Sequence, residues 1–195
     1  TSHIIRLPQE DCCQALGFPP TLKYQSDGGP GMRDIFGLLK GADDAQADQI
    51  AFFKSQILFW LIGATDGHAK NFSIFLKPGG RYSLAPLYDV LSAQPAADRG
   101  QIAPNRFRLA MSAGVNRHYR IGEVMGRHFV QTGKAAGLGR VAMRDAITEL
   151  LERSIDAPET ALAAMPNDFT QPIHASIATA ISKRLPLLAA ALEDL

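Results

Sequence analysis

The feature that most constrains the fold is a long apolar segment that stops at a polar loop. From about Asp44 to Gly63, apolar residues recur at the spacing of an α-helix, and they become nearly continuous toward its end. This pattern predicts a helix whose last turns lie in the core. Because Gly63 favours the end of a helix, residues 65–71 are expected in a loop held by that buried helix.

Two short aromatic and aliphatic runs follow the loop. Residues 72–76 and 82–84 flank Lys77-Pro78-Gly79-Gly80, which is typical of a β-hairpin with a glycine-rich turn. Residues 107–111 suggest one more short strand.

The remaining sequence indicates helices and loops. Helices are expected over residues 9–17, 121–136, 140–155 and 171–193, with a shorter one after Pro158. A loop is expected at 26–31, where three glycines and a proline disfavour regular structure. In the last helix an i+4 stripe is interpreted as core: Ile173, Ile177, Ile181 and Leu185. The predicted fold class is therefore mainly α with a small β-hairpin.

Length and composition favour one globular unit. At 195 residues and 46% hydrophobic, the chain can bury one sizeable core, as a single domain or a large lobe of a bigger one. It starts at Thr1 rather than Met, so we expect a cut end. The longest apolar run, 57–64, is far shorter than the roughly 18 residues of a membrane span, which predicts a soluble chain. Cys12 and Cys13 are adjacent, which favours free thiols in a reducing cytoplasm over a disulfide or metal motif.

The formal net charge of +1 hides a basic segment. Residues 104–144 hold eight Lys and Arg residues against the single acid Glu123. Such a segment is either a solvated face or a surface for nucleic acid or an acidic partner. Composition leaves both readings open.

The loop after the long helix carries the residues that point to chemistry. Protein-kinase catalytic loops place an Asp five residues before an Asn, the Asp orienting the attacking hydroxyl and the Asn holding Mg²⁺. Asp66 and Asn71 have this spacing. Two alternatives remain: Asp66 as a loop carboxylate that caps a turn, and Asp89 as an ordinary turn residue.

The predicted hairpin returns the chain to this loop. Neighbouring strands lie roughly 5 Å apart, so a turn at Pro78 and Gly79 places residues near Pro86 opposite residues near Asn71. Asp89 is then expected to supply the second metal-binding carboxylate that phosphoryl transfer requires.

Three neighbouring side chains have both a functional and a structural reading. His68 could donate to a phosphate oxygen or pack on the preceding helix. Lys70 could neutralise phosphate charge or simply lie in solvent. Tyr88 could touch the nucleotide or pack in the core.

Two other signals do not meet their motifs. Gly133-Lys134 lacks the upstream strand and the following Ser or Thr of a phosphate-binding P-loop. His118 and His128 have no Glu or Cys at ligand spacing, which disfavours a zinc site.

The string from Trp60 to Ser73, WLIGATDGHAKNFS, resembles the catalytic-loop signature of HipA-type serine/threonine kinases, the toxins of HipBA toxin-antitoxin systems. Segments 6–11, 23–31 and 86–90 are similar to HipA segments as well. The resemblance is close over about 5–129.

This resemblance implies the helical C-terminal lobe of a protein-kinase-like fold, with residues 1–195 as one catalytic-loop domain whose N-terminal lobe is absent. It implies ATP and Mg²⁺ as cofactors and a protein of translation as substrate, whose phosphorylation causes growth arrest and persistence. The expected partner is a HipB-like helix-turn-helix antitoxin that brings the kinase to operator DNA. Asp66 would be the catalytic base, and Asn71 and Asp89 would hold the metal. The residues expected near nucleotide are Gln9, His68, Lys70, Asn71, Tyr88 and Asp89.

The chain also departs from the family pattern. The glycine-rich phosphate loop, the strand lysine, the adenine hinge and the regulatory serine belong to an N-terminal part, so this fragment is expected to be inactive alone. Family DNA contacts would fall near Lys134, but Gly137 stands where an arginine is expected. Two alternatives therefore stay open: a non-catalytic helical module that docks antitoxin and DNA, and a metal hydrolase that uses Asp66, His68 and Asp89.

Overall fold

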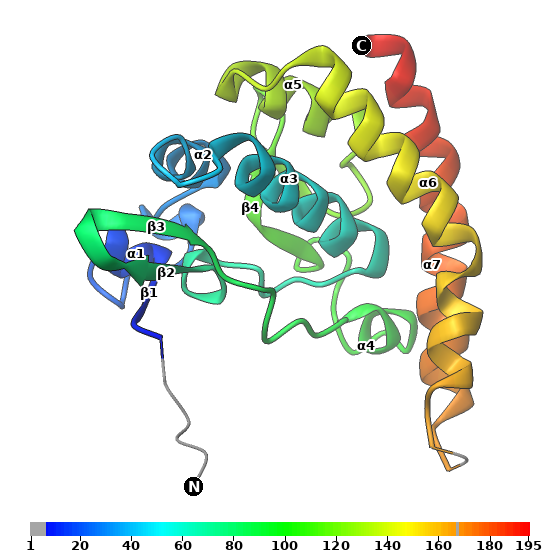
Figure 1. Ribbon diagram of the computed structural model, residues 1–195. Coiled ribbons are helices and arrows are strands. Elements are labelled where there is room, and N and C mark those ends of the chain that lie inside the picture. Colours follow the sequence, from blue (N-terminus) through cyan, green and yellow to red (C-terminus); the bar gives the residue numbers. More distant parts are fainter. Residues whose placement is uncertain (1–6, 167) are drawn as a thin grey trace, which may run out of the picture.

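A computed structural model of the chain describes residues 7–166 and 168–195, so the first residues of the family resemblance lie outside the described residues. The strands are β1 (Gln9–Asp11), β2 (Ser73–Lys77), β3 (Arg81–Leu84), β4 (Arg108–Ala113) and β5 (His118–Arg120). The helices are α1 (Cys12–Ala15), α2 (Met32–Leu39), α3 (Ala45–Ile62), α4 (Gln94–Asp98), α5 (Gly126–Ala136), α6 (Arg140–Ala163) and α7 (Gln171–Ala189). The mainly α-helical prediction is confirmed (Figure 1).

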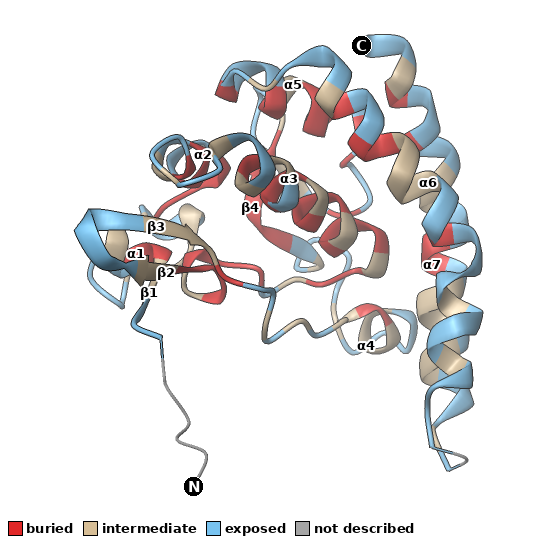
Figure 2. Ribbon diagram, in the orientation of Figure 1, coloured by how far each residue is buried: buried red, intermediate tan, exposed pale blue. Residues whose placement is uncertain are grey.

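Helix α3 lies at the centre of the molecule, as its apolar pattern predicts. Asp44 caps its start by accepting a hydrogen bond from the Ala47 amide, and Gly63 ends it in the left-handed conformation with φ 69°. Most of the large apolar side chains of α3 are buried, and much of its ribbon is red in Figure 2. The indole of the fully buried Trp60 donates to the Ile121 carbonyl at 3.2 Å. The helix therefore fixes the position at which the next loop begins.

The predicted hairpin is present and belongs to a three-stranded antiparallel sheet in the order β1-β2-β3. In its register Ile74 lies opposite Leu84, and the turn at Pro78–Gly80 uses positive φ angles at both glycines. Strand β1 pairs with the other edge of β2. The predicted helix over 9–17 is therefore wrong in its first residues, because their backbone groups bond to β2 and Asp11 caps a helix that starts only at Cys12.

A second, two-stranded sheet joins β4 and β5. Strand β4 confirms the strand predicted at 107–111. The helix predicted from Ile121 starts later, at Gly126, because the preceding segment pairs with β4 and then turns. Helices α2 and α4 were not predicted, since short helices carry a weak periodic signal.

Helices α6 and α7 form a long antiparallel pair along one side of the molecule (Figure 1). The predicted break near Ile155 is wrong, because α6 continues through Pro158 to Ala163. The core interpretation of the α7 stripe holds for Ile181, which is buried, and for Ile177 and Leu185, which pack against the core. Both cysteines are buried free thiols, as predicted.

The segment Gln171–Asp194, α7 with its final 3-10 turn, is long and apolar enough to cross a membrane, and no other helix within 7–166 or 168–195 meets that test. Core helices of soluble proteins pass the same test of length and composition. Only 22% of the apolar window is buried, and much of α7 is tan or blue in Figure 2. The helix nevertheless packs on α3, α4 and α6.

Candidate active site

The loop between α3 and β2 is packed tightly against the helix that precedes it. A Cβ atom added at Gly67 would lie 2.3 Å from the Phe59 ring, which is buried in the core. The loop then closes on itself, since the His68 amide donates to the Asp66 carbonyl at 2.8 Å. Glycine at position 67 therefore allows the loop to lie against α3.

Asp66 and Asn71 are brought together, as their spacing predicts. The buried Asn71 side chain donates from Nδ2 to the Asp66 carbonyl at 2.7 Å. Its Oδ1 makes no hydrogen bond with any described residue, and the Asp66 side chain is 54% exposed. Asn71 thus braces the loop and keeps one oxygen available, while the Asp66 carboxylate faces solvent.

Asp89 returns to the same region through the hairpin. The Ala85 amide donates to the Ser73 carbonyl at 2.8 Å, so the chain after β3 runs beside the loop, as predicted. Asp89 is exposed, has a φ of 54° and makes no hydrogen bond or ion pair with the described residues. Its charge and that of Asp66 both act to raise the pKa of His68, with Asp89 the weaker of the two.

His68 is 4% exposed, and burial outweighs the two carboxylates and lowers its pKa below the usual value. It is therefore neutral at pH 7. Its Nε2 lies 3.7 Å from Asp66 Oδ1, and its buried Nδ1 has no hydrogen-bond partner among the described residues. The ring is both packed, as the structural reading expects, and adjacent to the carboxylate.

Tyr24 is the site residue that sequence reasoning missed. Its hydroxyl donates to Asp66 Oδ1 at 2.6 Å, and its ring meets His68 edge-on with centroids 5.0 Å apart. The bond to Asp66, with burial second, raises the pKa of Tyr24 to about 12. The only signal was its position in the 23–31 segment that resembles HipA, to which no role had been assigned.

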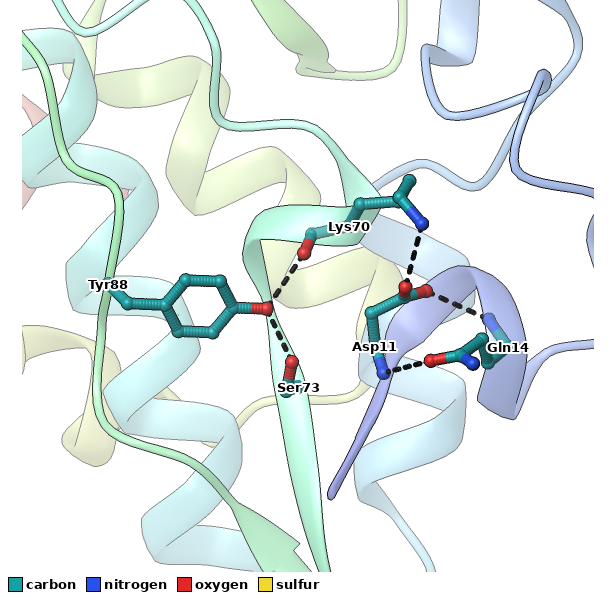
Figure 3. A network of polar contacts seen from close by, with 5 residues as sticks. All are labelled: Asp11, Gln14, Lys70, Ser73 and Tyr88. Atoms are coloured by element: carbon teal, nitrogen blue, oxygen red, sulfur yellow. Dashed lines mark hydrogen bonds and ion pairs between the residues drawn. The ribbon is translucent and has the colours of Figure 1, made fainter.

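Lys70 and Tyr88 tie the loop to the small sheet (Figure 3). Lys70 Nζ lies 2.9 Å from Asp11 Oδ2, and this contact raises the lysine's pKa. The Tyr88 hydroxyl donates to the Lys70 carbonyl at 2.7 Å and also bonds to the Ser73 hydroxyl. Burial raises the pKa of Tyr88. Both side chains are therefore engaged in holding the loop in place.

Two predicted residues lie elsewhere. Gln9 is exposed in β1 opposite Phe75. Lys134 lies in the last turn of α5 and donates to the Asp194 carbonyl at 2.5 Å, near the end of the chain. Neither lines the cavity at Asp66. Of the other predicted site residues, five are not part of its lining either: His68, Lys70, Asn71, Tyr88 and Asp89.

That cavity, which we call the Asp66 cavity, has a volume of about 360 Å³. Asp66 forms part of its wall with Tyr24 and two arginines. The full lining is Tyr24, Ser26, Asp27, Thr65, Asp66, Arg106, Arg108, Leu109, Ala110 and Tyr119. The carboxylate of the predicted base therefore faces a space that a substrate could enter.

The basic side chains of segment 104–144 differ in their contacts, although Arg108 lies opposite Arg120 in the register of β4 and β5. Arg106 and Arg108 line the Asp66 cavity, whereas Arg117 lines a separate cavity beside α2. Arg120 pairs with Glu123 at 2.7 Å, and Arg144 donates to the carbonyls of Leu192 and Leu195. The charges of this segment are therefore divided among two cavities, one ion pair and the C-terminal end of the chain.

The donors of the site suit Mg²⁺, which prefers oxygen ligands. Asn71 Oδ1 and the Asp89 carboxylate have no hydrogen-bond partners among the described residues, and neither has Asp66 Oδ2. Within the described residues, no group of three or more His, Cys, Asp or Glu side chains converges, so the three-ligand set of the hydrolase reading is not formed. His118 and His128 stack face to face with centroids 3.9 Å apart.

Two proteins named as kinases are similar to this chain in sequence. A Sinorhizobium fredii protein named "Putative kinase Y4mE" is 36% identical over 153 residues, covering 78% of this chain and 34% of that protein. The serine/threonine-protein kinase toxin HipA of Shewanella oneidensis is 32% identical over 108 residues, covering 49% of this chain and 24% of HipA. The chain thus spans about a third or less of these two relatives.

Two solved structures share the fold. One is the complex of Shewanella oneidensis HipA, HipB and operator DNA, with a TM-score of 0.81 at 20% identity over 99% of this chain and 47% of that chain. The other is the Helicobacter pylori proinflammatory kinase CtkA, with a TM-score of 0.60 at 12% identity over 96% of this chain and 70% of that one. The fold is therefore that of a kinase-like helical lobe.

The family of HipA-like C-terminal domains matches residues 2–158, which is most of the chain. This match covers the loop of Asp66 and Asn71, the hairpin and Asp89. The chain therefore belongs to the HipA-like C-terminal domain family.

Proposed function

We propose that this chain is the catalytic-loop lobe of a HipA-type serine/threonine kinase, which transfers phosphate from ATP to a protein of translation and so arrests growth. The observation that carries the proposal is the exposed Asp66 carboxylate, oriented by Tyr24, in a loop that Asn71 braces and beside which Asp89 arrives. Residues 1–195 would form one domain, which needs an N-terminal lobe for full activity.

Asp66 is proposed as the base that orients the substrate hydroxyl. Tyr24 occupies Oδ1, which leaves Oδ2 for the acceptor. Asn71 Oδ1 and Asp89 would hold Mg²⁺ through oxygen atoms. ATP with Mg²⁺ supplies the phosphoryl group and screens its charge when bound.

The remaining predicted residues would act around this centre. His68, which is neutral at pH 7, would donate to a phosphate oxygen, and Lys70 has two further N–H donors beyond the one it gives to Asp11. Tyr88 would hold the loop next to the nucleotide, and Gln9 would lie near it at the exposed strand.

The proposed partners follow from the relatives. The Shewanella oneidensis structure contains HipA, HipB and operator DNA. A HipB-like antitoxin and, mainly through it, operator DNA are therefore proposed for this protein. We also propose a cytoplasmic location without membrane association, because α7 carries Lys183 and Arg184 and packs on α3 and α6.

The full-length protein provides the test. Asp66→Asn should reduce phosphate transfer to background. It should leave the free energy of unfolding within about 0.5 kcal/mol of wild type, because the side chain is mostly exposed. Asp145→Asn, an exposed acid on α6, is the matched control and should keep full activity. Phosphate transfer retained by Asp66→Asn would refute the assignment of the base.

A further inference from the structure

The Asp66 cavity is lined by two arginines whose side chains have no direct partner among the described residues. Arg108 begins β4 and Arg106 lies in the loop before it; both are exposed and both line the cavity. Neither makes a hydrogen bond or an ion pair through its side chain to any residue within 7–166 or 168–195. This is unlike Arg120 and Lys70, which each have a carboxylate partner.

The size of the cavity sets how far these arginines lie from the acceptor. Both arginines share the wall of this cavity of about 360 Å³ with Asp66, and an extended peptide advances about 3.3 Å per residue. A substrate whose hydroxyl reaches Asp66 would therefore place residues one to three positions away beside Arg106 and Arg108.

The chemistry of those positions follows from the arginine side chain. A guanidinium presents a planar fork of N–H donors that matches a carboxylate or phosphate. Two acids also line the wall, the proposed base Asp66 and Asp27, and Asp27 accepts a hydrogen bond from Ser26 Oγ at 3.0 Å. Asp27 would oppose an acidic substrate, whereas the arginines would attract it, so the acidic group belongs on the β4 side of the cavity.

We propose that Arg106 and Arg108 select a protein substrate that carries Asp or Glu within about three residues of the Ser or Thr acceptor. This inference rests on the proposed kinase function and adds a substrate class to it. Arg106 and Arg108 are then specificity-determining residues.

Two peptides with the same Ser acceptor test the proposal, one with Glu at the three following positions and one with Gln. The full-length wild-type protein should phosphorylate the Glu peptide with a kcat/KM about tenfold higher. In R106Q/R108Q this ratio should fall to about one, whereas in Asp27→Asn it should rise. Arg117→Gln, an arginine of another cavity, is the matched control and should keep the wild-type ratio.

Equal use of both peptides by the wild-type protein would overturn the inference and leave the kinase function standing. A wild-type ratio that persists in R106Q/R108Q would overturn it as well. If neither peptide is phosphorylated, the proposed function fails, and fluorescence anisotropy of the labelled Glu peptide then decides the inference. Binding that weakens about tenfold in R106Q/R108Q supports it, and duplex DNA displacing the peptide through the same arginines contradicts it.

Discussion

At the scale of single residues, the contact between Tyr24 and Asp66 determines how the proposed base points. The hydroxyl donates to one carboxylate oxygen at 2.6 Å, and the other has no hydrogen-bond partner among the described residues. The same ring packs edge-on against His68. One aromatic side chain therefore contacts both the exposed carboxylate and the buried imidazole of the loop.

Removing this hydroxyl tests its positioning role. If the chain acts as proposed, Tyr24→Phe in the full-length protein should lower kcat for peptide phosphorylation about tenfold, because a hydrogen bond to a charged group is lost. The KM for ATP should change little. Tyr119→Phe, which lines the same cavity without bonding to Asp66, is the control. An unchanged kcat in Tyr24→Phe would rule out the positioning role, and steady-state kinetics measures both parameters.

The sequence predicted those site residues that depend on local spacing. Asp66 and Asn71 lie in one loop. The hairpin that returns Asp89 has a turn formed by Pro78 and two glycines, which are strong turn signals in the sequence. Tyr24 bonds to a residue 42 positions away, so only tertiary packing brings it to the loop. The spacing of residues within one loop cannot predict a contact between segments so far apart in the sequence.

At the scale of elements, the first turn of α5 contains a histidine, His128, that accepts a hydrogen bond and is therefore neutral on that nitrogen. His128 accepts a hydrogen bond from the Met125 amide at 3.1 Å through Nδ1, which needs an unprotonated nitrogen. It is 4% exposed. Burial, then the neighbouring His118 and Arg127, lowers the pKa of His128 to about 4.

This cap should make stability depend on pH. In the unfolded chain His128 is protonated below about pH 6.5, whereas in the folded chain it is protonated only below about pH 4. The free energy of unfolding therefore falls as the pH drops from about 6.5 to about 4. The loss should be about 2 kcal/mol between pH 7 and pH 5. Urea unfolding at both pH values measures it.

The variant His128→Gln should lose most of this pH dependence, because a glutamine oxygen can accept the same hydrogen bond without titrating. His118→Gln should lose only part, since it removes the second cause. A pH dependence that is unchanged in His128→Gln would contradict the assignment to this histidine.

Other elements show why sequence patterns mislocated some boundaries. Strands β1 and β5 have three residues each and exist because a partner strand satisfies their backbone groups. In α6, Pro158 interrupts the pattern but not the helix, which packs along α7. The long α3 was predicted well because its caps, Asp44 and Gly63, are local signals.

At the scale of the whole molecule, the C-terminal helix reaches back to the helix that supports the proposed catalytic loop. Arg184 of α7 donates to the Leu61 carbonyl at 2.8 Å and to Gln94 Oε1 at 2.7 Å. Burial lowers the pKa of Arg184 to about 10, so it remains charged at neutral pH. It satisfies a carbonyl in the last turn of α3, whose partners are otherwise missing at a helix end.

Replacing Arg184 should therefore weaken the assembly of the whole lobe. Arg184→Gln is expected to lower the free energy of unfolding by about 2 kcal/mol, because two charge-assisted hydrogen bonds are lost. Lys183→Gln, the exposed neighbour, should change it by less than about 0.5 kcal/mol. Denaturant titration of both variants measures the difference, and equal stability of the two would contradict this role for Arg184.

Asp89 adopts a left-handed backbone conformation, with φ 54°, which glycine accepts freely and which Asp and Asn visit more often than other L-residues. Holding a carboxylate there costs on the order of 1 kcal/mol of conformational free energy. On backbone conformation alone, glycine would suit this position best. The carboxylate at position 89 is therefore not explained by stability, and the lobe is slightly less stable than it would be with glycine there.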